Sequence, residues 1–381
     1  MSRDGPEAAL ILLSAGTATR RARSREPAAR LARAADWELL AAMLQGRRLL
    51  PQLGERIVEI CDAPEPFAAA VERSVRQTRR QGALLQLVSV RLTQALAAAG
   101  VRSLTLKGAF LGESIYGDAG RRAAGDIDLL VAPGDLAAAV EIARGEGYGA
   151  PTDHAGRDGL PLLHYALAHE SGQLPPLELH WRVHWYERAF GSDMLARAVD
   201  DPRCGLRARP ADELASLLLF YARDGFVDLR LAADIGAWWD AFGASLEPGA
   251  LSAILQRYPA IDRALVAAAT VAERVVGLPR EWLTGPRRIG VRARLAARLA
   301  NPGACGAEAQ LNADVGLVDG LLAPSGGHWD FARRQLLPPR QVLDKRSRAR
   351  AAGRVSPLGH GARVLGRYGL RIARLPPWPV A

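Results

Sequence analysis

The chain has 381 residues, of which 49% are hydrophobic, so it can bury a sizeable core and is not a mostly disordered protein. Its three cysteines lie far apart, which excludes a disulfide framework and a Cys-x-x-Cys zinc site and favours a reducing compartment. The formal net charge is +10, but residues 331–381 hold twelve Arg or Lys and one acidic residue, so the remainder is close to neutral. A basic tail can bind nucleic acid or an acidic partner, but no aromatic interleaving or nucleic-acid motif accompanies it. We therefore favour a solvated terminus and do not expect nucleic acid as a partner.

The sequence carries no signal for a membrane or for secretion. It contains no run of eighteen apolar residues, so we expect no membrane span. The apolar segment Ala8–Ala15 is short, and acidic residues precede it where a secretory signal would carry basic ones. We therefore expect a cytoplasmic protein.

Hydrophobic periodicity predicts that both ends of the chain are helical and that its central part contains strands as well as helices. Breakers at Pro51 and at 62–66 separate short helices within 27–61, and apolar residues at helical spacing predict one long helix over 66–99. After Gly100 the pattern alternates with a period of two, which predicts strands. The expected strands are about 103–106, 126–131, 163–169 and 177–184, and the later helices are about 109–116, 133–144, 211–224, 229–242, 248–257, 261–275 and 288–300.

These elements predict an α+β protein with a small mixed sheet and flanking helices. We divide the chain into an N-terminal helical region (1–100), an α+β core (101–210), a helical C-terminal domain (211–330) and a basic tail (331–381). The tail is rich in Pro, Gly and Arg and shows little apolar periodicity, so we expect it to be only partly ordered. Its removal should change the melting temperature by no more than a few degrees.

The segment Asp126-Ile127-Asp128-Leu129 holds the most informative pattern for chemistry. On a strand, side chains alternate between the two faces, so Asp126 and Asp128 share one face while Ile127 and Leu129 point to a core. Their Cα atoms are then about 7 Å apart, which lets both carboxylates reach one pair of divalent ions. Ligation by oxygen alone suits Mg²⁺ or Mn²⁺ rather than zinc. The alternative is a surface pair of carboxylates at the edge of a strand.

Two other segments add to this pattern. The alternation of Leu177 and Leu179 with Glu178 predicts a strand whose polar face, beside the first strand, would place a third carboxylate near the aspartates. Lys107-Gly108 ends one strand and precedes a helix. A glycine there lets the backbone approach a phosphate, and the helix N-terminus offers free N–H groups to it.

Several side chains keep two interpretations each. Lys107 either contacts a phosphate or only ends a strand, and Arg122 either clamps a phosphate with two hydrogen bonds or is a solvated turn residue. His180 shares a face with Glu178 and either touches an acceptor or makes a structural hydrogen bond. Five of the seven histidines lie between 154 and 184, but their spacing is not that of a metal site, so we do not expect zinc.

The order of these motifs resembles the DNA polymerase beta-like nucleotidyltransferase superfamily. More narrowly, the chain is similar to an uncharacterised bacterial nucleotidyltransferase family over about residues 30–300. The segments that carry this resemblance are Asp36-Trp37, Leu106-Lys107-Gly108, Tyr116, Arg122, Gly125 to Val131, Gly147-Tyr148, Glu178-Leu179-His180-Trp181 and the stretch from Leu231 to Asp234-Ile235.

The resemblance implies a nucleotidyltransferase-like fold and a metal-dependent transfer of NMP from an NTP to an acceptor. It assigns Asp126, Asp128 and Glu178 to catalysis and to binding of Mg²⁺ or Mn²⁺, with Glu178 also orienting or deprotonating the acceptor hydroxyl. The implied nucleotide contacts are Lys107, Gly108, Ala109 and Arg122. Family members occur near natural-product and polysaccharide genes, so the acceptor is a small molecule, a natural-product peptide, a polysaccharide precursor or a protein.

The alternative function is a non-catalytic binding or regulatory module on the same fold. The intact set of three carboxylates favours the enzyme, since a decayed site would tend to lose one of them. We expect Asp128→Asn to reduce catalysis on the order of 10²-fold or more. Without metal, we expect this variant to be as stable as the wild type or more so, because two close carboxylates repel.

Overall fold

The structure is a computed structural model of the whole chain. It describes residues 5–151, 162–279, 289–300, 308–324, 327, 332–333, 336–337 and 356–373. The fold is α+β, 64% helical, with a small mixed sheet of four strands, so the predicted fold class is confirmed. Within the described residues, no helix is long and apolar enough to cross a membrane.

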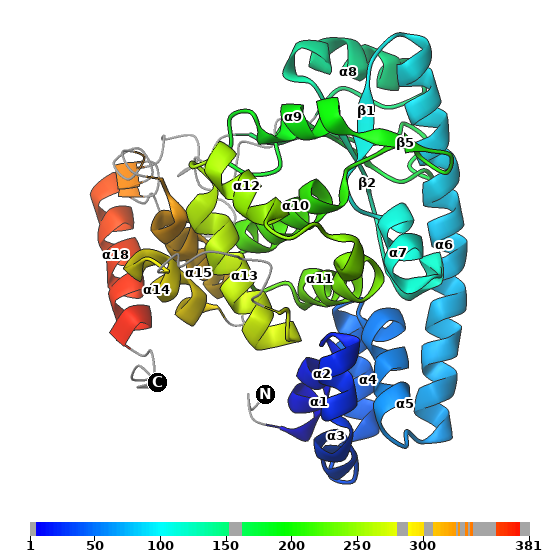
Figure 1. Cartoon of the computed structure of the whole chain (residues 1–381), viewed down its shortest axis with the longest axis vertical. Helices are drawn as coiled ribbons and strands as arrows, with labels where there is room; N and C mark the ends of the chain where they lie inside the picture. Colours follow the sequence, from blue (N-terminus) through cyan, green and yellow to red (C-terminus); the bar gives the residue numbers. More distant parts are fainter. Residues whose placement is uncertain are drawn as a thin grey trace.

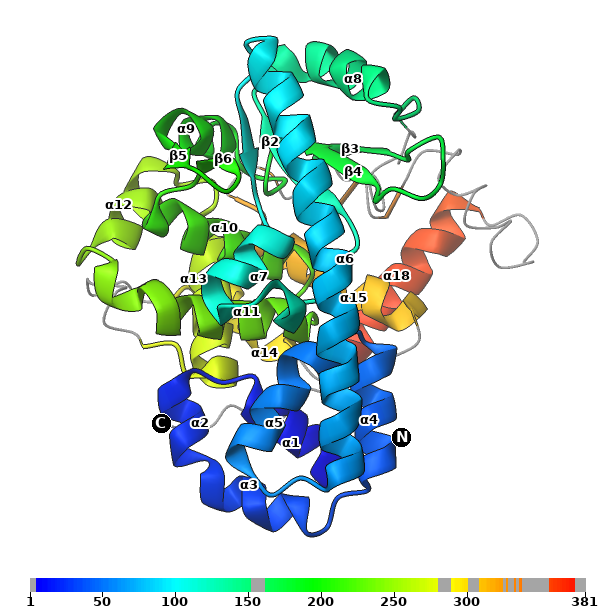
Figure 2. The ribbon, with the colours of Figure 1, turned by 90° about the vertical axis from the view of Figure 1, so that its right-hand side faces the viewer.

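The N-terminal region consists of short helices and one long helix that borders the sheet (Figures 1 and 2). Pro51 lies in the first turn of a short π-helix, Leu50–Gly54, which separates the α-helices 37–46 and 55–60, as predicted. The long helix is α6 (Glu65–Ala98), and its apolar stripe faces the protein core, as its sequence spacing predicted. The short helices are α1 (Pro6–Ser14), α2 (Ala18–Arg23), α3 (Arg25–Ala32), α4 (Trp37–Gly46) and α5 (Glu55–Ile60).

The central sheet has the strand order β1-β2-β4-β3. Its strands are β1 (Ser103–Thr105), β2 (Ile127–Val131), β3 (His164–Leu167) and β4 (Leu177–His180). The pair β2–β4 is parallel and the other two pairs are antiparallel. Both β3 and β4 are shorter than predicted. Past β4, the N–H of Val183 donates to the Glu187 carboxylate (2.7 Å), so a side chain takes the place of a strand partner.

Strand β2 is buried on both faces. Ile127 and Leu129 pack in a core with α6 and α8 (Leu136–Gly145), whereas Leu130 packs in a larger core with the C-terminal helices. The predicted alternation of β2 is therefore confirmed, and both of its faces are covered. Helix α7 (Ala109–Tyr116) follows β1, as predicted.

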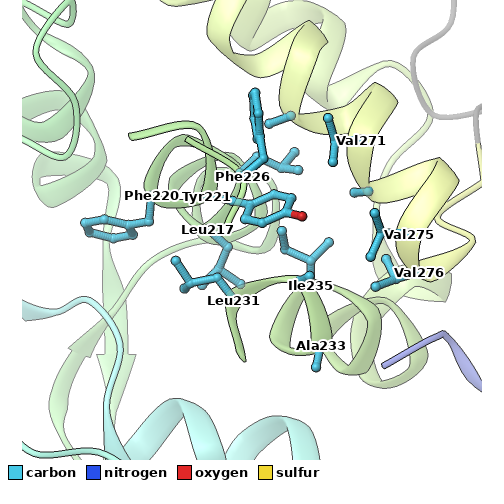
Figure 3. Packing of buried hydrophobic residues seen from close by; sticks show 14 of the residues in the cluster. Leu217, Phe220, Tyr221, Phe226, Leu231, Ala233, Ile235, Val271, Val275 and Val276 are labelled. Carbon is cyan, nitrogen blue, oxygen red and sulfur yellow. The ribbon is translucent and has the colours of Figure 1, made fainter. Parts of the chain in front are cut away.

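The C-terminal half is built around the buried helices α10 (Pro210–Arg223) and α11 (Leu229–Phe242). Figure 3 shows Tyr221 and Ile235 of these helices packed toward Val271 of α13 (Asp262–Val276). The five helices predicted from residue 211 to residue 300 are all present. The other elements are α9 (Phe190–Arg197), a ribbon of β5 (Val199–Asp201) and β6 (Gly205–Arg207) that was not predicted, α12 (Ala250–Arg257), α14 (Val291–Leu299), α15 (Glu308–Leu322) and α18 (Pro357–Ala373).

The larger core crosses the predicted region boundaries, because it contains Leu40 of α4, Leu130 of β2 and Leu219 of α10. The division at 100, 210 and 330 stays a prediction. In the tail, the expected lack of periodicity is wrong for α18, whose Tyr368 packs against this core. Residues 338–355 and 374–381 of the tail lie outside the described residues.

Candidate active site

Three carboxylates meet at one end of the parallel strand pair. The register of β2 and β4 places Asp128 directly beside Glu178, and Asp126 immediately precedes β2. One carboxylate oxygen from each of the three residues lies within 4.8 Å of the others. The structure thus brings together the three residues that the sequence singled out, and their roles stay predictions.

Asp128 is the buried centre of this group, with 1% of its surface exposed. Its Oδ1 accepts hydrogen bonds from Lys107 Nζ (2.5 Å) and His180 Nε2 (3.0 Å). Burial acts to raise the pKa of Asp128, but the charge of Lys107 and the hydrogen bond from His180 lower it well below its usual range. The other oxygen, Oδ2, is buried and has no hydrogen-bond partner among the described residues.

His180 joins two of the carboxylates. Its Nε2 also lies 3.2 Å from Glu178 Oε2, and because both neighbours are ionised acceptors, this nitrogen carries the proton. Burial opposes ionisation of Glu178, but the hydrogen bond from His180 and the electrostatic attraction of His180 and Lys107 together outweigh it, so the pKa of Glu178 is lowered. His180 is fully buried, which supports its structural interpretation over contact with an acceptor.

Lys107 stays charged in this setting. Burial acts to lower its pKa, but the negative charges of Asp128, Asp126 and Glu178 raise it above its usual value. The lysine therefore does more than end a strand, because its ammonium neutralises the buried Asp128.

Gly108 forms the turn between β1 and α7. Its φ of +91° lies in a region that glycine adopts far more readily than other residues. This conformation places Gly108 immediately before the N-terminus of α7 and in the lining of the cavity beside Asp126. Ala109 is the first residue of α7, and its side chain packs in the smaller core.

Arg122 is buried, so its interpretation as a solvated turn residue is wrong. Its Nε donates to Asp234 Oδ2 of α11 (2.9 Å), and its Nη1 donates to the carbonyl oxygen of Gly108 (3.3 Å). Asp234 is fully buried and also accepts hydrogen bonds from Gln52 (2.9 Å) and Tyr116 (3.0 Å). This network fastens the Gly108 turn to α11.

A cavity of about 280 Å³ opens between these groups and the C-terminal helices. Its sheet wall contains Lys107, Gly108, Asp126 and Asp128. Its helical wall comes from the end of α10, the loop that follows and the start of α11. The sequence marked only Leu231 of this second wall, as part of a segment that resembles the family, and it predicted no site residue there. The wall consists of Phe220, Arg223, Asp224, Asp228, Arg230 and Leu231, with Arg48 at the margin.

The sequence matches the model of a family described as uncharacterised nucleotidyltransferase over residues 33–277, which is more than half of the chain. The chain belongs to this family. No curated protein shows significant similarity to it. The family match includes both walls of the cavity, and the predicted family is thereby confirmed.

In this member of the nucleotidyltransferase family, the cluster of three carboxylates formed by Asp126, Asp128 and Glu178 fits a divalent cation. It offers three oxygen ligands, and the orphaned Asp128 Oδ2 is a buried acceptor that a cation would satisfy. A second group, His164, Glu178 and His180, also has ligand atoms within 4.8 Å. The Nδ1 atoms of both histidines are buried without hydrogen-bond partners among the described residues, whereas metal-bound imidazoles usually donate their other N–H. The carboxylates are therefore the better site.

From the geometry of the site, we now expect Asp128→Asn to lower the stability of the metal-free protein, whereas the sequence alone led us to expect equal or higher stability. Repulsion between carboxylates was the basis of that expectation, but Lys107 and His180 already bind Asp128 in the metal-free protein. Removing the charge of Asp128 would leave the largely buried Lys107 ammonium without its closest counter-charge.

Proposed function

We propose that this protein is a metal-dependent nucleotidyltransferase that transfers NMP from an NTP to an acceptor hydroxyl. The observation that carries the proposal is the convergence of Asp126, Asp128 and Glu178, of which the two aspartates line a cavity together with the Gly108 turn and with arginines on the opposite wall. Carboxylates bind the cations, and the turn and basic side chains suit a polyphosphate.

Asp126 and Asp128 would hold the divalent ions, Mg²⁺ or Mn²⁺, and Glu178 would complete the ligand set. Such ions, when bound, stabilise the negative charge that develops during phosphoryl transfer and in the pyrophosphate product. The lowered pKa values of Asp128 and Glu178 keep both groups ionised at neutral pH, which is the state that binds cations.

The triphosphate would lie along the Gly108 turn. There the backbone can approach closely, and the N-terminus of α7 presents N–H groups with a partial positive charge. Lys107 contributes a permanent positive charge beside Asp128. Arg122 would act by fixing the Gly108 carbonyl, which its Nη1 holds at 3.3 Å. Arg48 and Arg230 approach Ala124 and Ala123, next to Asp126, and are placed to meet further phosphate oxygens.

Glu178 would orient the acceptor hydroxyl. It is less buried than Asp128, and its ionised carboxylate can accept the proton of an incoming hydroxyl group. A small molecule, a natural-product peptide, a polysaccharide precursor or a protein can each present such a hydroxyl.

The test is incubation of the purified protein with each of the four α-labelled NTPs, Mg²⁺ or Mn²⁺ and candidate acceptors. We expect metal-dependent label transfer that Asp128→Asn abolishes and that Glu141→Gln, an exposed acidic residue on α8, leaves intact. Nucleotide binding without transfer to any acceptor would favour the non-catalytic binding module. Absence of both nucleotide binding and transfer would contradict both functions.

A further inference from the structure

We propose that Arg223 forms an anion-binding subsite for the acceptor, so that the acceptor carries a phosphate or carboxylate group close to the hydroxyl that receives the nucleotide. This inference rests on the proposed transferase function. It assigns a chemical class to the acceptor and a binding role to a residue at the end of α10.

Phe220 holds Arg223 at the cavity. In Figure 3 the ring of Phe220 is turned away from Tyr221 and Leu217, and it belongs to the lining of the cavity. The guanidinium carbon of Arg223 lies 4.7 Å from the centre of this ring, and Lys107 Nζ lies 5.6 Å from the same centre. Stacking on an aromatic ring fixes the guanidinium at the cavity without neutralising its charge.

Three of the other four basic residues of the cavity are held in closer ion pairs than Arg223, and the fourth, Arg48, donates a hydrogen bond to the carbonyl oxygen of Ala124 (3.3 Å). Lys107 is paired with Asp128 (2.5 Å), Arg122 with Asp234 (2.9 Å) and Arg230 with Asp228 (3.3 Å). The ion pair of Arg223 with Asp224 is long, 3.9 Å from Nε to Oδ1. The Arg223 side chain is only 14% exposed, and its Nη1 is buried with no hydrogen-bond partner among the described residues.

The surroundings of Arg223 give it little compensation. The two imidazoles that interact with its charge, those of His164 and His184, cannot carry a negative charge, so neither offers Arg223 a counter-charge. The negative end of α10 supplies only a partial charge. A largely buried guanidinium with a distant counter-charge is costly, and a bound anion with two oxygens relieves that cost through paired hydrogen bonds.

Arg223 lies on the acceptor side of the cavity. It stacks on Phe220, whose ring centre lies 6.2 Å from that of His180, and His180 Nε2 lies 3.2 Å from Glu178, the carboxylate assigned to the acceptor hydroxyl. Arg48 and Arg230 lie instead near Ala124 and Ala123, beside Asp126. The two groups of arginines therefore serve different ligands: Arg48 and Arg230 face the nucleotide, and Arg223 faces the acceptor.

The test uses the full chain with Ca²⁺ and non-hydrolysable α,β-methylene analogues of the four NTPs. The complex with the analogue that binds most tightly is titrated calorimetrically with inorganic phosphate and, separately, with acetate. We expect saturable binding of at least one anion, and Arg223→Gln should weaken it by about tenfold, the effect of losing a charged hydrogen bond. The affinity for the NTP analogue should change by less than about threefold. Arg223→Lys keeps the charge, and should bind the anion with intermediate affinity. Arg80→Gln, an exposed position on α6, is the matched control.

Equal anion binding by wild type and Arg223→Gln would overturn the inference. A tenfold loss of affinity for the NTP analogue in Arg223→Gln would also overturn it, because Arg223 would then belong to the nucleotide. If no analogue binds to the wild type, the proposed transferase function fails. In that case, titration of the nucleotide-free proteins with phosphate and with acetate still tests whether Arg223 binds an anion. If Arg223→Gln does not fold, Arg223→Lys replaces it in these titrations.

Discussion

The two walls of the cavity differ in how their residues come together. On the sheet wall, Asp126 and Asp128 are two residues apart, and Glu178 joins them through the register of two paired strands. On the helical wall, Arg223 and Arg230 belong to different helices, and Arg48 precedes them by more than 170 residues. The carboxylates that we propose as metal ligands are thus marked by a short local pattern, whereas the position of the arginines opposite them depends on how the helices pack.

A buried ion pair, Arg122–Asp234, joins the two walls. Arg122 lies beside the Gly108 turn and Asp234 lies on α11, so their contact sets the position of one wall relative to the other. If this comparison is right, breaking the ion pair should lower the free energy of unfolding of the whole protein. Substitutions that change only one wall should instead affect mainly the ligand or the reaction assigned to that wall.

The largest expected effect on stability is that of Asp234→Ala. The change leaves the Arg122 guanidinium buried without its counter-charge, which typically costs about 3–5 kcal/mol. Urea denaturation should show this loss in the free energy of unfolding. Glu26→Gln, which removes an exposed ion pair on α3, should change it by less than about 1 kcal/mol. The double variant with Arg122→Met should recover part of the loss, and a stable Asp234→Ala protein would mean that other contacts align the walls.

On the sheet wall, Asp128→Asn should reduce both catalysis and stability. We expect label transfer to fall on the order of 10²-fold or more, since the metal site loses one of its charges. The metal-free melting temperature should fall too, because Lys107 and His180 both donate to the carboxylate. Full activity in the variant would discard the metal-dependent mechanism. A raised melting temperature would show that repulsion among the carboxylates outweighs the ion pair with Lys107.

The buried His184 should make the protein less stable in mild acid. Its pKa is lowered to about 3 by burial and by Arg223, so between pH 6.5 and that value the unfolded chain binds a proton that the folded chain does not. Stability therefore decreases as the pH falls through this window, on the order of 2 kcal/mol between pH 6.5 and 5.

Urea denaturation of the wild type and of His184→Gln at several pH values measures this effect. The variant should show a shallower dependence on pH, because it has no imidazole to protonate at this position. Parallel curves for the two proteins would assign the acid sensitivity to other groups.

The smallest expected effect is that of removing residues 331–381. The helix α18 in this segment packs on the core through Tyr368, but both walls of the cavity lie outside it. We expect the melting temperature to change by no more than a few degrees and label transfer to be retained. Tyr368→Ala in the full chain should reproduce most of any shift. Loss of soluble protein on truncation would show that the tail is part of the fold.

Sequence reasoning succeeded where local periodicity decides the outcome. The spacing of apolar residues predicted the long α6 and the five later helices up to residue 300, because burying one face of a helix requires that spacing. It failed for the ribbon of β5 and β6, whose strands have three residues each, and for α18 in a segment dominated by charge. A pattern of three residues is too short to show a period.

The sequence by itself determined the family and the proximity of Asp126 to Asp128, which lie two residues apart at the start of β2. Only the tertiary structure decided that Lys107 and His180 neutralise Asp128, that Arg122 is buried against Asp234 and that Arg223 faces the carboxylates. The reason is that an ion pair between distant residues depends on the packing of whole helices and strands, and no local spacing records which charges that packing brings together.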